Sequence, residues 1–458
     1  MPISSDPYTN ASSQHKTQVE PDSFAFGSTI VSVIQTGRFF DGGASNIAWS
    51  TSHDAGHSWT TGTLPGTTVY AGGPWARVSD PAVAYDPLHN VWMVSSLAFG
   101  LGFSPLGSPS AVLTSRSTDG GLTWQDPVTV SFTTSFYDKN WIACDTWAAS
   151  PHYGNCYTEW DDNGAGNRLE MSTSTDGGLT WGPALSPTGF PSGLGGQPVA
   201  QPNGTVVVPY SVNDAAIGSF RSTDGGASWG GVTTVAGVTD HFVAGGLRTS
   251  PLPLVEVDAA GKVYVVWQDC RFRTSCLSND IVMSTSTDGL TWSAPSRIPI
   301  DATTSTVDHF IPGIAVDPAT SASSAHLALG YYYYPERSCN ASTCQLTVGF
   351  VFSRDGGATW SAPQQVSQHM MISWIASTSQ GRMVGDYMST SFTSDGKAHP
   401  VFAIAKAPQG SVYNEQAATA TFDVMNGRLR PAGAAREKPV FKLRQGLRAH
   451  LGVNPRRD

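Results

Sequence analysis

The sequence predicts an all-β protein, a closed β-propeller of seven blades, from three observations. Only 13% of the 458 residues are charged, whereas Gly (48), Trp (14) and Tyr (14) are plentiful, which favours short strands and tight turns over surface helices. One octapeptide recurs along the chain at blade-sized intervals. Pairs of apolar, alternating runs precede its copies, as expected of the inner strands of a blade.

The octapeptide has the form Ser-x-Asp-x-Gly-x-x-Trp. Its aspartates are Asp54, Asp119, Asp176, Asp224 and Asp355, and a copy one residue shorter contains Asp288. Successive aspartates are 65, 57, 48, 64 and 67 residues apart, about the length of a four-stranded blade. We expect a hairpin in which the carboxylate accepts backbone N–H bonds, Gly takes a positive φ and Trp packs between sheets. The six carboxylates are therefore interpreted as scaffold.

The blade count follows from the paired apolar runs. Residues 82–85 and 91–94 form one such pair, and the pattern recurs without an octapeptide at 387–390 and 399–404, which predicts a seventh blade. We expect residues 16–19 to add an outer strand to this last blade beside 418–422, because ring closure removes exposed edges.

The prediction divides the chain into an N-terminal extension (1–14), a single propeller (15–425) and a basic C-terminal tail (426–458). From Met425 onward there are nine Lys or Arg residues against Glu437 and Asp458. We interpret this segment as a tail or linker, with an anchor to an anionic surface as the alternative.

Charge and cysteine spacing predict the compartment and exclude some partners. A net charge of −9 argues against nucleic acid, and no apolar run of about 18 residues is present to cross a membrane. The six cysteines fall into three close pairs, Cys144/Cys156, Cys270/Cys276 and Cys339/Cys344, which suit disulfides closing local loops. Six reduced core cysteines are the alternative. We expect a secreted or extracellular protein, although residues 1–4 lack signal-peptide features.

Together, the six octapeptides resemble the Asp boxes, or BNR repeats, of the sialidase (neuraminidase) superfamily over residues 15–425, with a six-bladed sialidase-type propeller as the alternative to seven blades. The resemblance implies three arginines around a substrate carboxylate, a Tyr nucleophile assisted by Glu, and an Asp acid/base. The family places its first arginine in a Phe/Tyr-Arg-Ile-Pro motif on an early inner strand. Here the sole Arg-Ile-Pro, at 297–299, follows the fifth box in an outer-strand position, which counts against sialic-acid hydrolysis.

Candidate binding residues gather where the innermost strands begin, at one mouth of the central channel. Arg77, Arg248 and Arg382 lie at three such positions and could cradle a carboxylate, whereas pairing with neighbouring aspartates would make them part of the channel wall. Further predicted substrate-binding residues are Lys139 at another strand start, and Arg271 and Tyr332 on overarching loops. These residues predict an acidic oligo- or polysaccharide as the partner.

The candidate catalytic residues depend on the reaction. In a hydrolase, Asp80 or Glu159 would be the general acid/base and Tyr387 or Tyr332 the nucleophile. In a uronate lyase, a His or a Tyr would remove the C5 proton, and the histidine candidates are His309 and His241, each within an Asp-His-Phe triplet.

The first hypothesis is an exo-acting glycoside hydrolase. The alternatives are the lyase and a non-catalytic glycan- or protein-binding propeller. We expect a monomer without a cofactor. Residues 161–164 (Asp-Asp-Asn-Gly) could hold a structural calcium ion, although they lack a complete loop signature.

Overall fold

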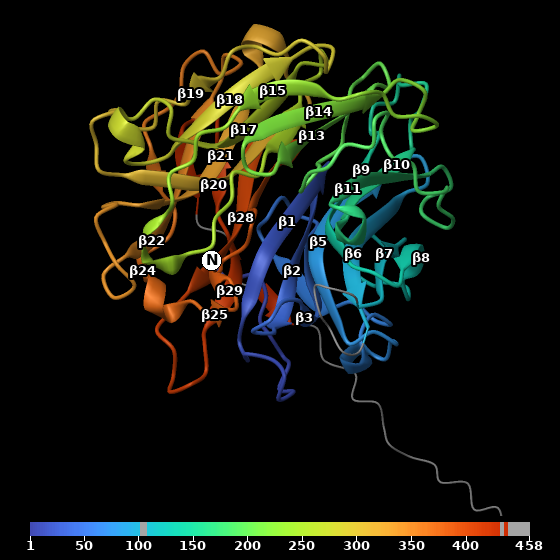
Figure 1. Ribbon diagram of the computed structural model, residues 1–458, viewed down its shortest axis with the longest axis horizontal. Coiled ribbons are helices and arrows are strands. Elements are labelled where there is room, and N and C mark those ends of the chain that lie inside the picture. The colour runs from blue at the N-terminus through green and yellow to red at the C-terminus, as the bar shows by residue number, and fades with distance from the viewer. Residues whose placement is uncertain (101–107, 431–434, 438–458) are drawn as a thin grey trace, which may run out of the picture.

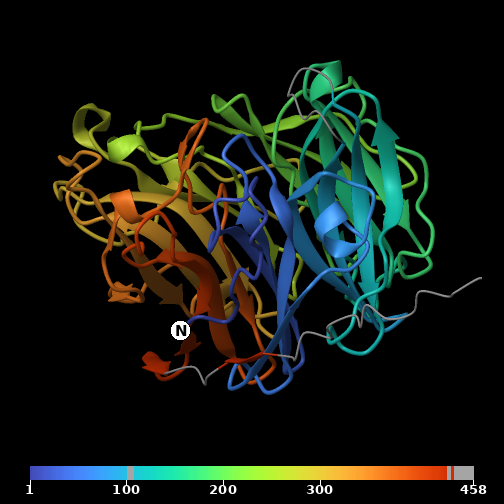
Figure 2. The ribbon, with the colours of Figure 1, turned by 90° about the horizontal axis from the view of Figure 1, so that it is seen from below.

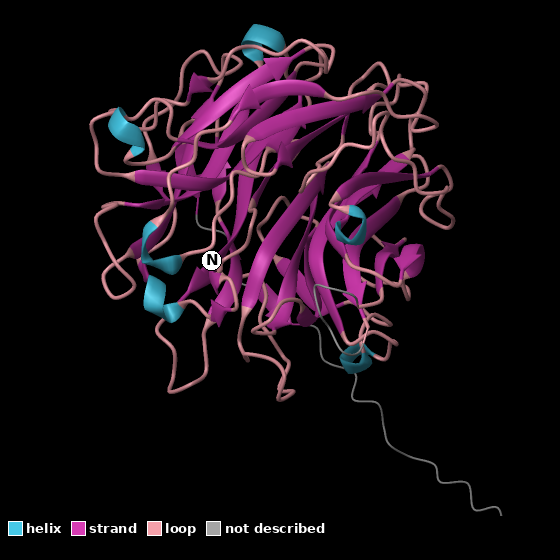
Figure 3. Cartoon of the chain, in the orientation of Figure 1, coloured by secondary structure: helices cyan, strands magenta, loops and turns pink. Residues whose placement is uncertain are grey.

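The computed structural model describes residues 1–100, 108–430 and 435–437. The chain is an all-β propeller whose antiparallel sheets follow one another in chain order around a common centre (Figure 1). The all-β prediction is therefore confirmed. Helical structure in the described residues consists of single 3₁₀ turns (Figure 3). Their bounds are η1 (Val69–Ala71), η2 (Asn163–Ala165), η3 (Ala244–Gly246), η4 (Thr274–Cys276), η5 (Ala322–Ser324) and η6 (Ile372–Trp374).

Five meanders have four antiparallel strands each, the arrangement of a propeller blade. They comprise β1 to β4 (Gln18–Phe26, Thr29–Arg38, Ala44–Ser52, Trp59–Thr63), β5 to β8 (Arg77–Asp86, Val91–Phe99, Ser110–Ser117, Val128–Thr133), β12 to β15 (Val199–Ala200, Val206–Val212, Ala216–Ser222, Thr233–Gly237), β16 to β19 (Leu254–Val257, Val263–Asp269, Asp280–Ser286, Ser296–Arg297) and β20 to β23 (Asp308–Val316, Leu327–Tyr334, Gln345–Ser353, Gln364–Gln365).

Two further meanders have three strands each. They comprise β9 to β11 (Tyr137–Cys144, Cys156–Asp162, Arg168–Ser174) and β27 to β29 (Ser389–Phe392, Lys397–Ala405, Glu415–Thr419). The remaining short strands are β24 (Met370–Met371), β25 (Ser377–Thr378), β26 (Gly381–Arg382), β30 (Thr421–Asp423), β31 (Arg428–Arg430) and β32 (Ala435–Glu437). The count of seven blades stays a prediction.

The first residues of the chain pair with the last meander. The Ile3 N–H donates to the Ala417 carbonyl at 2.9 Å, the Thr419 N–H donates to the Met1 carbonyl at 2.9 Å, and Pro2 forms a bridge with Ala418. Figure 2 shows the N-terminus beside these red strands. The Ile3 side chain is fully buried.

Two segments of the N-terminal region contact the last meander. Residues 1–3 pair with β29, and the predicted closing segment 16–19 also contacts it, because the Glu415 N–H donates to the Lys16 carbonyl at 2.8 Å. Residues 18–26 form β1, which pairs with β2 in the first meander. The predicted basic tail lies largely outside the described residues. Its described part contains the two short strands β31 and β32.

All six octapeptides form the expected hairpin. In the copy at 222–229, Ser222 Oγ donates to Asp224 Oδ1 at 2.7 Å, the Gly226 N–H donates to Ser222 Oγ at 2.9 Å, and the Ser228 N–H donates to Asp224 Oδ1 at 3.0 Å. Gly226 has a φ of 84°, which requires glycine. Burial alone would raise the pKa of Asp224, but hydrogen bonds from Ser228 and Ser222 outweigh it and lower that pKa. The carboxylate caps its own turn.

All three predicted disulfides are formed: Cys144–Cys156, Cys270–Cys276 and Cys339–Cys344. The first joins β9 to β10 and the other two close short loops.

Within the described residues, no helix has the length and apolar character needed to cross a membrane.

Candidate functional site

Several innermost strands are interrupted at the same relative place by a bulge. Register shifts fall between Val19 and Asp22 in β1 and between Ser79 and Ala82 in β5. At these shifts Glu20 has a φ of 58° and Asp80 a φ of 48°, and on β9 Lys139 has a φ of 34°. Such left-handed conformations are unfavourable for residues other than glycine and cluster at functional sites. A bulge also re-aims a side chain.

These bulged residues meet at one buried ammonium group. Lys139 Nζ donates to Asp80 Oδ1 at 2.9 Å and to Asp386 Oδ2, and it lies 3.4 Å from Glu20 Oε1. Arg248 Nη2 donates to the same Asp386 oxygen. Lys139, Glu20, Asp80 and Asp386 are each at most 7% exposed. One cation therefore ties together the starts of β1, β5 and β9 and the segment before β27.

The carboxyl groups around Lys139 ionise differently. Burial, with the charges of Asp80 and Asp386, raises the pKa of Glu20 to about 8 against the opposing effect of Lys139. Burial also favours the neutral form of Asp386, but Arg248 and Lys139 outweigh it and lower its pKa to about 2. Near neutral pH the site thus combines a protonated carboxyl with an ionised one, the pattern that separates acid from base in an active site.

A cavity of about 280 Å³ opens beside this cluster. Its charged lining residues are Glu20, Arg38, Asp41, Asp80, Asp138, Lys139 and Arg248. Polar lining residues are Gln35, Ser79, Asn163, Thr378, Ser379 and Gln380, and the apolar ones are Phe99, Phe136 and Met383. Of the predicted inner-strand residues, Asp80, Lys139 and Arg248 line this cavity.

Arg38 is the cavity cation with the weakest existing partners. It lies at the end of β2 and is 3% exposed; its Nη1 donates to the Phe39 carbonyl at 3.3 Å and its Nη2 to Met383 Sδ at 3.0 Å. No carboxylate among the described residues lies within ion-pair distance of it. Burial lowers its pKa. A guanidinium held this way can accept an anionic ligand through charge-assisted bonds.

The predicted arginine triad does not assemble. Of its members only Arg248 is among the described residues that line the cavity. Arg77 bonds to Asp41 Oδ1 at 2.8 Å and to the Gly42 carbonyl at 2.7 Å, and Arg382 donates to the Ile375 carbonyl. Both guanidinium groups are therefore held by local partners.

Several other predicted residues lie away from the cavity. The Tyr332 hydroxyl donates to the Ala403 carbonyl at 2.8 Å in the core, and the Tyr387 hydroxyl donates to the Pro81 carbonyl at 3.1 Å. Burial raises the pKa of Tyr387 well above its usual value, which disfavours the phenolate that a nucleophile needs. Glu159 is fully buried on β10, and Arg271 pairs with Asp269 at 2.6 Å.

His309 belongs to a separate ion cluster. Burial lowers its pKa to about 4, and its Nε2 lies 3.9 Å from Asp301. Asp280, Asp301 and His309 have ligand atoms within 4.8 Å of one another, close enough to hold a metal ion. Arg273 and Arg297 nevertheless already pair with both carboxylates, so the cluster is compensated without a metal. Arg297 lies on outer strand β19, as predicted.

The predicted calcium segment contains a capped turn. Asp162 Oδ1 accepts the Ala165 N–H at 3.2 Å at the start of η2. Asp161 is buried, and that burial raises its pKa well above the usual value. A calcium ion at this segment stays a prediction.

Sequence reasoning missed the roles of Glu20, Arg38 and Asp386. One signal existed: Glu20-Pro21 and Asp80-Pro81 are matching acid-proline pairs at the two bulges. Arg38 carries no comparable signal, because it comes from the far end of a second strand.

Residues 111–311 match the model of a family described as BNR repeat-like domain. The predicted resemblance to BNR-repeat proteins is thereby confirmed for these residues. No curated protein matches the chain.

Solved structures similar to the chain include the Hadza microbial sialidase Hz136 (15% identity, 89% of this chain and 67% of that chain, TM-score 0.46). The intramolecular trans-sialidase from Ruminococcus gnavus is another (14% identity, 94% and 99%, TM-score 0.47). A third is a protein of unknown function from Dyadobacter fermentans (15% identity, 77% and 99%, TM-score 0.48).

Proposed function

We propose that the protein is a secreted, carbohydrate-active propeller that binds a carboxylate-bearing glycan in the cavity beside Lys139 and hydrolyses its terminal residue. The observation that carries the proposal is the pairing, in one cavity, of the weakly partnered Arg38 with the carboxyl groups of Glu20 and Asp80, of which Glu20 has a raised pKa. Arg38 binds the substrate carboxylate, because Lys139 and Arg248 are already engaged by Asp386. A cavity of about 280 Å³ suits one sugar residue, which favours exo-action.

The carboxyl groups supply the chemistry. Protonated Glu20 donates its proton to the glycosidic oxygen as the bond to the anomeric carbon breaks. Asp80, held by Lys139, accepts a proton from water, and the resulting hydroxide bonds to the anomeric carbon. Glu20 and Asp80 each have a carboxyl oxygen within 3.4 Å of Lys139 Nζ. That places them near the lower end of the separation of roughly 6.5–9.5 Å at which paired carboxyls leave room for an attacking water.

Hydrolysis is favoured over elimination by the lining of the cavity. No histidine is among the described residues that line it, and His309 is held in the separate cluster with Asp301. Elimination with a histidine as the base that removes the C5 proton of a uronate is therefore disfavoured in this cavity.

The test compares substrates and variants. The protein is incubated with fluorogenic α-sialosides and β-glucuronides and with ulvan-like and pectic polymers, while absorbance near 235 nm reports a new double bond. Fluorophore release is expected, and Arg38→Gln, Glu20→Gln and Asp80→Asn should each lower kcat/KM at least about 100-fold. Arg354→Gln, which changes an arginine bonded to the Val424 carbonyl, is the control and should keep activity. Absorbance at 235 nm without fluorophore release would establish the lyase. The absence of both signals would contradict the proposal that the protein is an enzyme.

Three further parts of the proposal rest on the fold. The two three-stranded meanders count as blades, which gives seven. Three disulfides support secretion. We also propose a monomer, to be tested by light scattering.

A further inference from the structure

A second cavity occupies the central channel. It has a volume of about 220 Å³ and is lined by the innermost strand of every meander, namely β1, β5, β9, β12, β16, β20 and β27. It shares no lining residue with the cavity beside Lys139. Most of the wall is apolar, including the aromatic side chains of Phe24, Trp141, Trp147 and Phe392.

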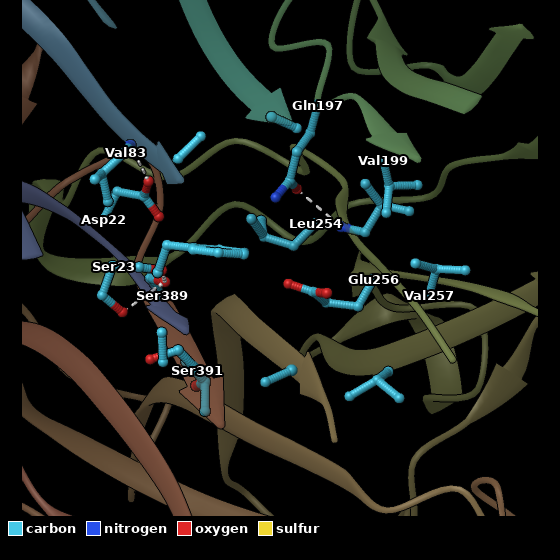
Figure 4. Close-up of a pocket in the computed structure, with 18 of the residues that line it drawn as sticks. Asp22, Ser23, Val83, Gln197, Val199, Leu254, Glu256, Val257, Ser389 and Ser391 are labelled. Atoms are coloured by element: carbon cyan, nitrogen blue, oxygen red, sulfur yellow. Dashed lines mark hydrogen bonds between the residues drawn. The ribbon is translucent and has the colours of Figure 1, made fainter. Parts of the chain in front are cut away.

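Two carboxyl groups interrupt this apolar wall. Figure 4 shows Asp22 and Glu256 directed into the cavity from opposite sides. They are the only titratable groups among the described lining residues, so no cation balances them. Ser391 Oγ, in a residue that is 6% exposed, also lies at this cavity without a hydrogen-bond partner.

Asp22 has a structural role that Glu256 lacks. Asp22 Oδ2 accepts the Val83 N–H at 2.8 Å and so ties β1 to β5. Glu256 lies between Val255 and Val257 on β16 and bonds to no side chain among the described residues. Burial and the charge of Asp22 raise the pKa of Glu256 to about 8, and burial raises that of Asp22 to about 7. Asp22 is buried and Glu256 is half-buried, and withdrawing carboxylates from water without a counter-ion is costly.

We propose that the channel cavity binds a small organic cation, an ammonium group on an apolar body, with the ammonium between Asp22 and Glu256. The aromatic wall suits the body of such a ligand and can attract its charge. A calcium ion would need six or more converging oxygen ligands, whereas this wall is mostly apolar and has two carboxyl groups on opposite sides. A neutral apolar guest would leave both carboxyls unpaired. Apolar cavities of about 150 Å³ bind benzene, so a benzylammonium-sized ligand fits.

The experiment is calorimetric titration of the full chain with benzylammonium, benzyl alcohol, benzoate and calcium chloride. Benzylammonium should bind one to one, at least about tenfold tighter than the other three. The observed enthalpy at pH 7 should differ between phosphate and Tris buffers, because the entering cation makes the carboxyls release protons. Glu256→Gln should weaken binding at least about tenfold, whereas Glu336→Gln, which changes an exposed carboxyl, should not.

Equal binding of benzyl alcohol, tighter binding of calcium, unchanged affinity in Glu256→Gln or no heat with benzylammonium would each overturn the proposal. A variant-free measurement guards against misfolding of Glu256→Gln: crystals of the unaltered protein are soaked in 4-bromobenzylammonium. An anomalous bromine peak in the channel supports the site, and a peak only elsewhere contradicts it. Glycoside hydrolysis at the other cavity should proceed unchanged with benzylammonium present, so the two proposals fail independently.

Discussion

Replacing Lys139 with methionine should destabilise the protein by about 3–5 kcal/mol, the cost of removing one partner from a buried ion pair. Three carboxyl groups surround the ammonium, but the loss of Lys139 affects them unequally. Glu20, with a pKa of about 8, is already protonated near pH 7, and Asp386 keeps its bond to Arg248. Asp80 is the carboxylate left without a cation, so the expected loss is that of one uncompensated charge.

The assay is guanidinium-induced unfolding at 25 °C and pH 7, with Lys397→Met as the matched control. Lys397 pairs with Asp395, whose side chain is 37% exposed, so its replacement should cost less than about 1 kcal/mol. A loss no greater than that of the Lys397 variant would refute the view that this ammonium holds the inner strands together.

Three further predictions concern stability. Glu256 holds its proton more tightly when folded, with a pKa of about 8, so wild-type stability should fall as pH rises from about 4.5 to 8. The stability of Glu256→Gln relative to wild type should therefore increase between pH 5 and pH 9 in denaturant titrations. Replacing Cys270 and Cys276 with serine opens a loop with a sequence separation of 6 and should cost about 2 kcal/mol by calorimetry; no change would show that the loop is held by other contacts. Ile3→Ala should cost about 2–5 kcal/mol because the side chain is fully buried beside the last meander, and an unchanged unfolding midpoint would contradict closure by residues 1–3.

The sequence predicts the scaffold well because the octapeptide is a local structure. Each copy carries its own serine, aspartate and glycine, so hairpin geometry follows without knowledge of the rest of the chain. Closure of the ring is different. The pairing of Ile3 with Ala417 joins residues far apart in the chain, and three residues are too few to show an alternating pattern.

The site is only partly predictable for a similar reason. Inner-strand starts identify Asp80, Lys139 and Arg248, because strand geometry brings them to one mouth. Arginine side chains are long, however, and Arg77 and Arg382 reach local partners instead. The channel cavity could not be predicted from the sequence, because the residues that line it follow the ordinary pattern of buried strands.

The most direct test of the proposed function is a crystal structure of the protein with a bound acidic monosaccharide, such as N-acetylneuraminic or glucuronic acid. The proposal predicts the sugar in the cavity beside Lys139, with its carboxylate within hydrogen-bond distance of the Arg38 guanidinium and its anomeric carbon facing Glu20 and Asp80. A sugar bound elsewhere on the propeller, with that cavity empty, would contradict it.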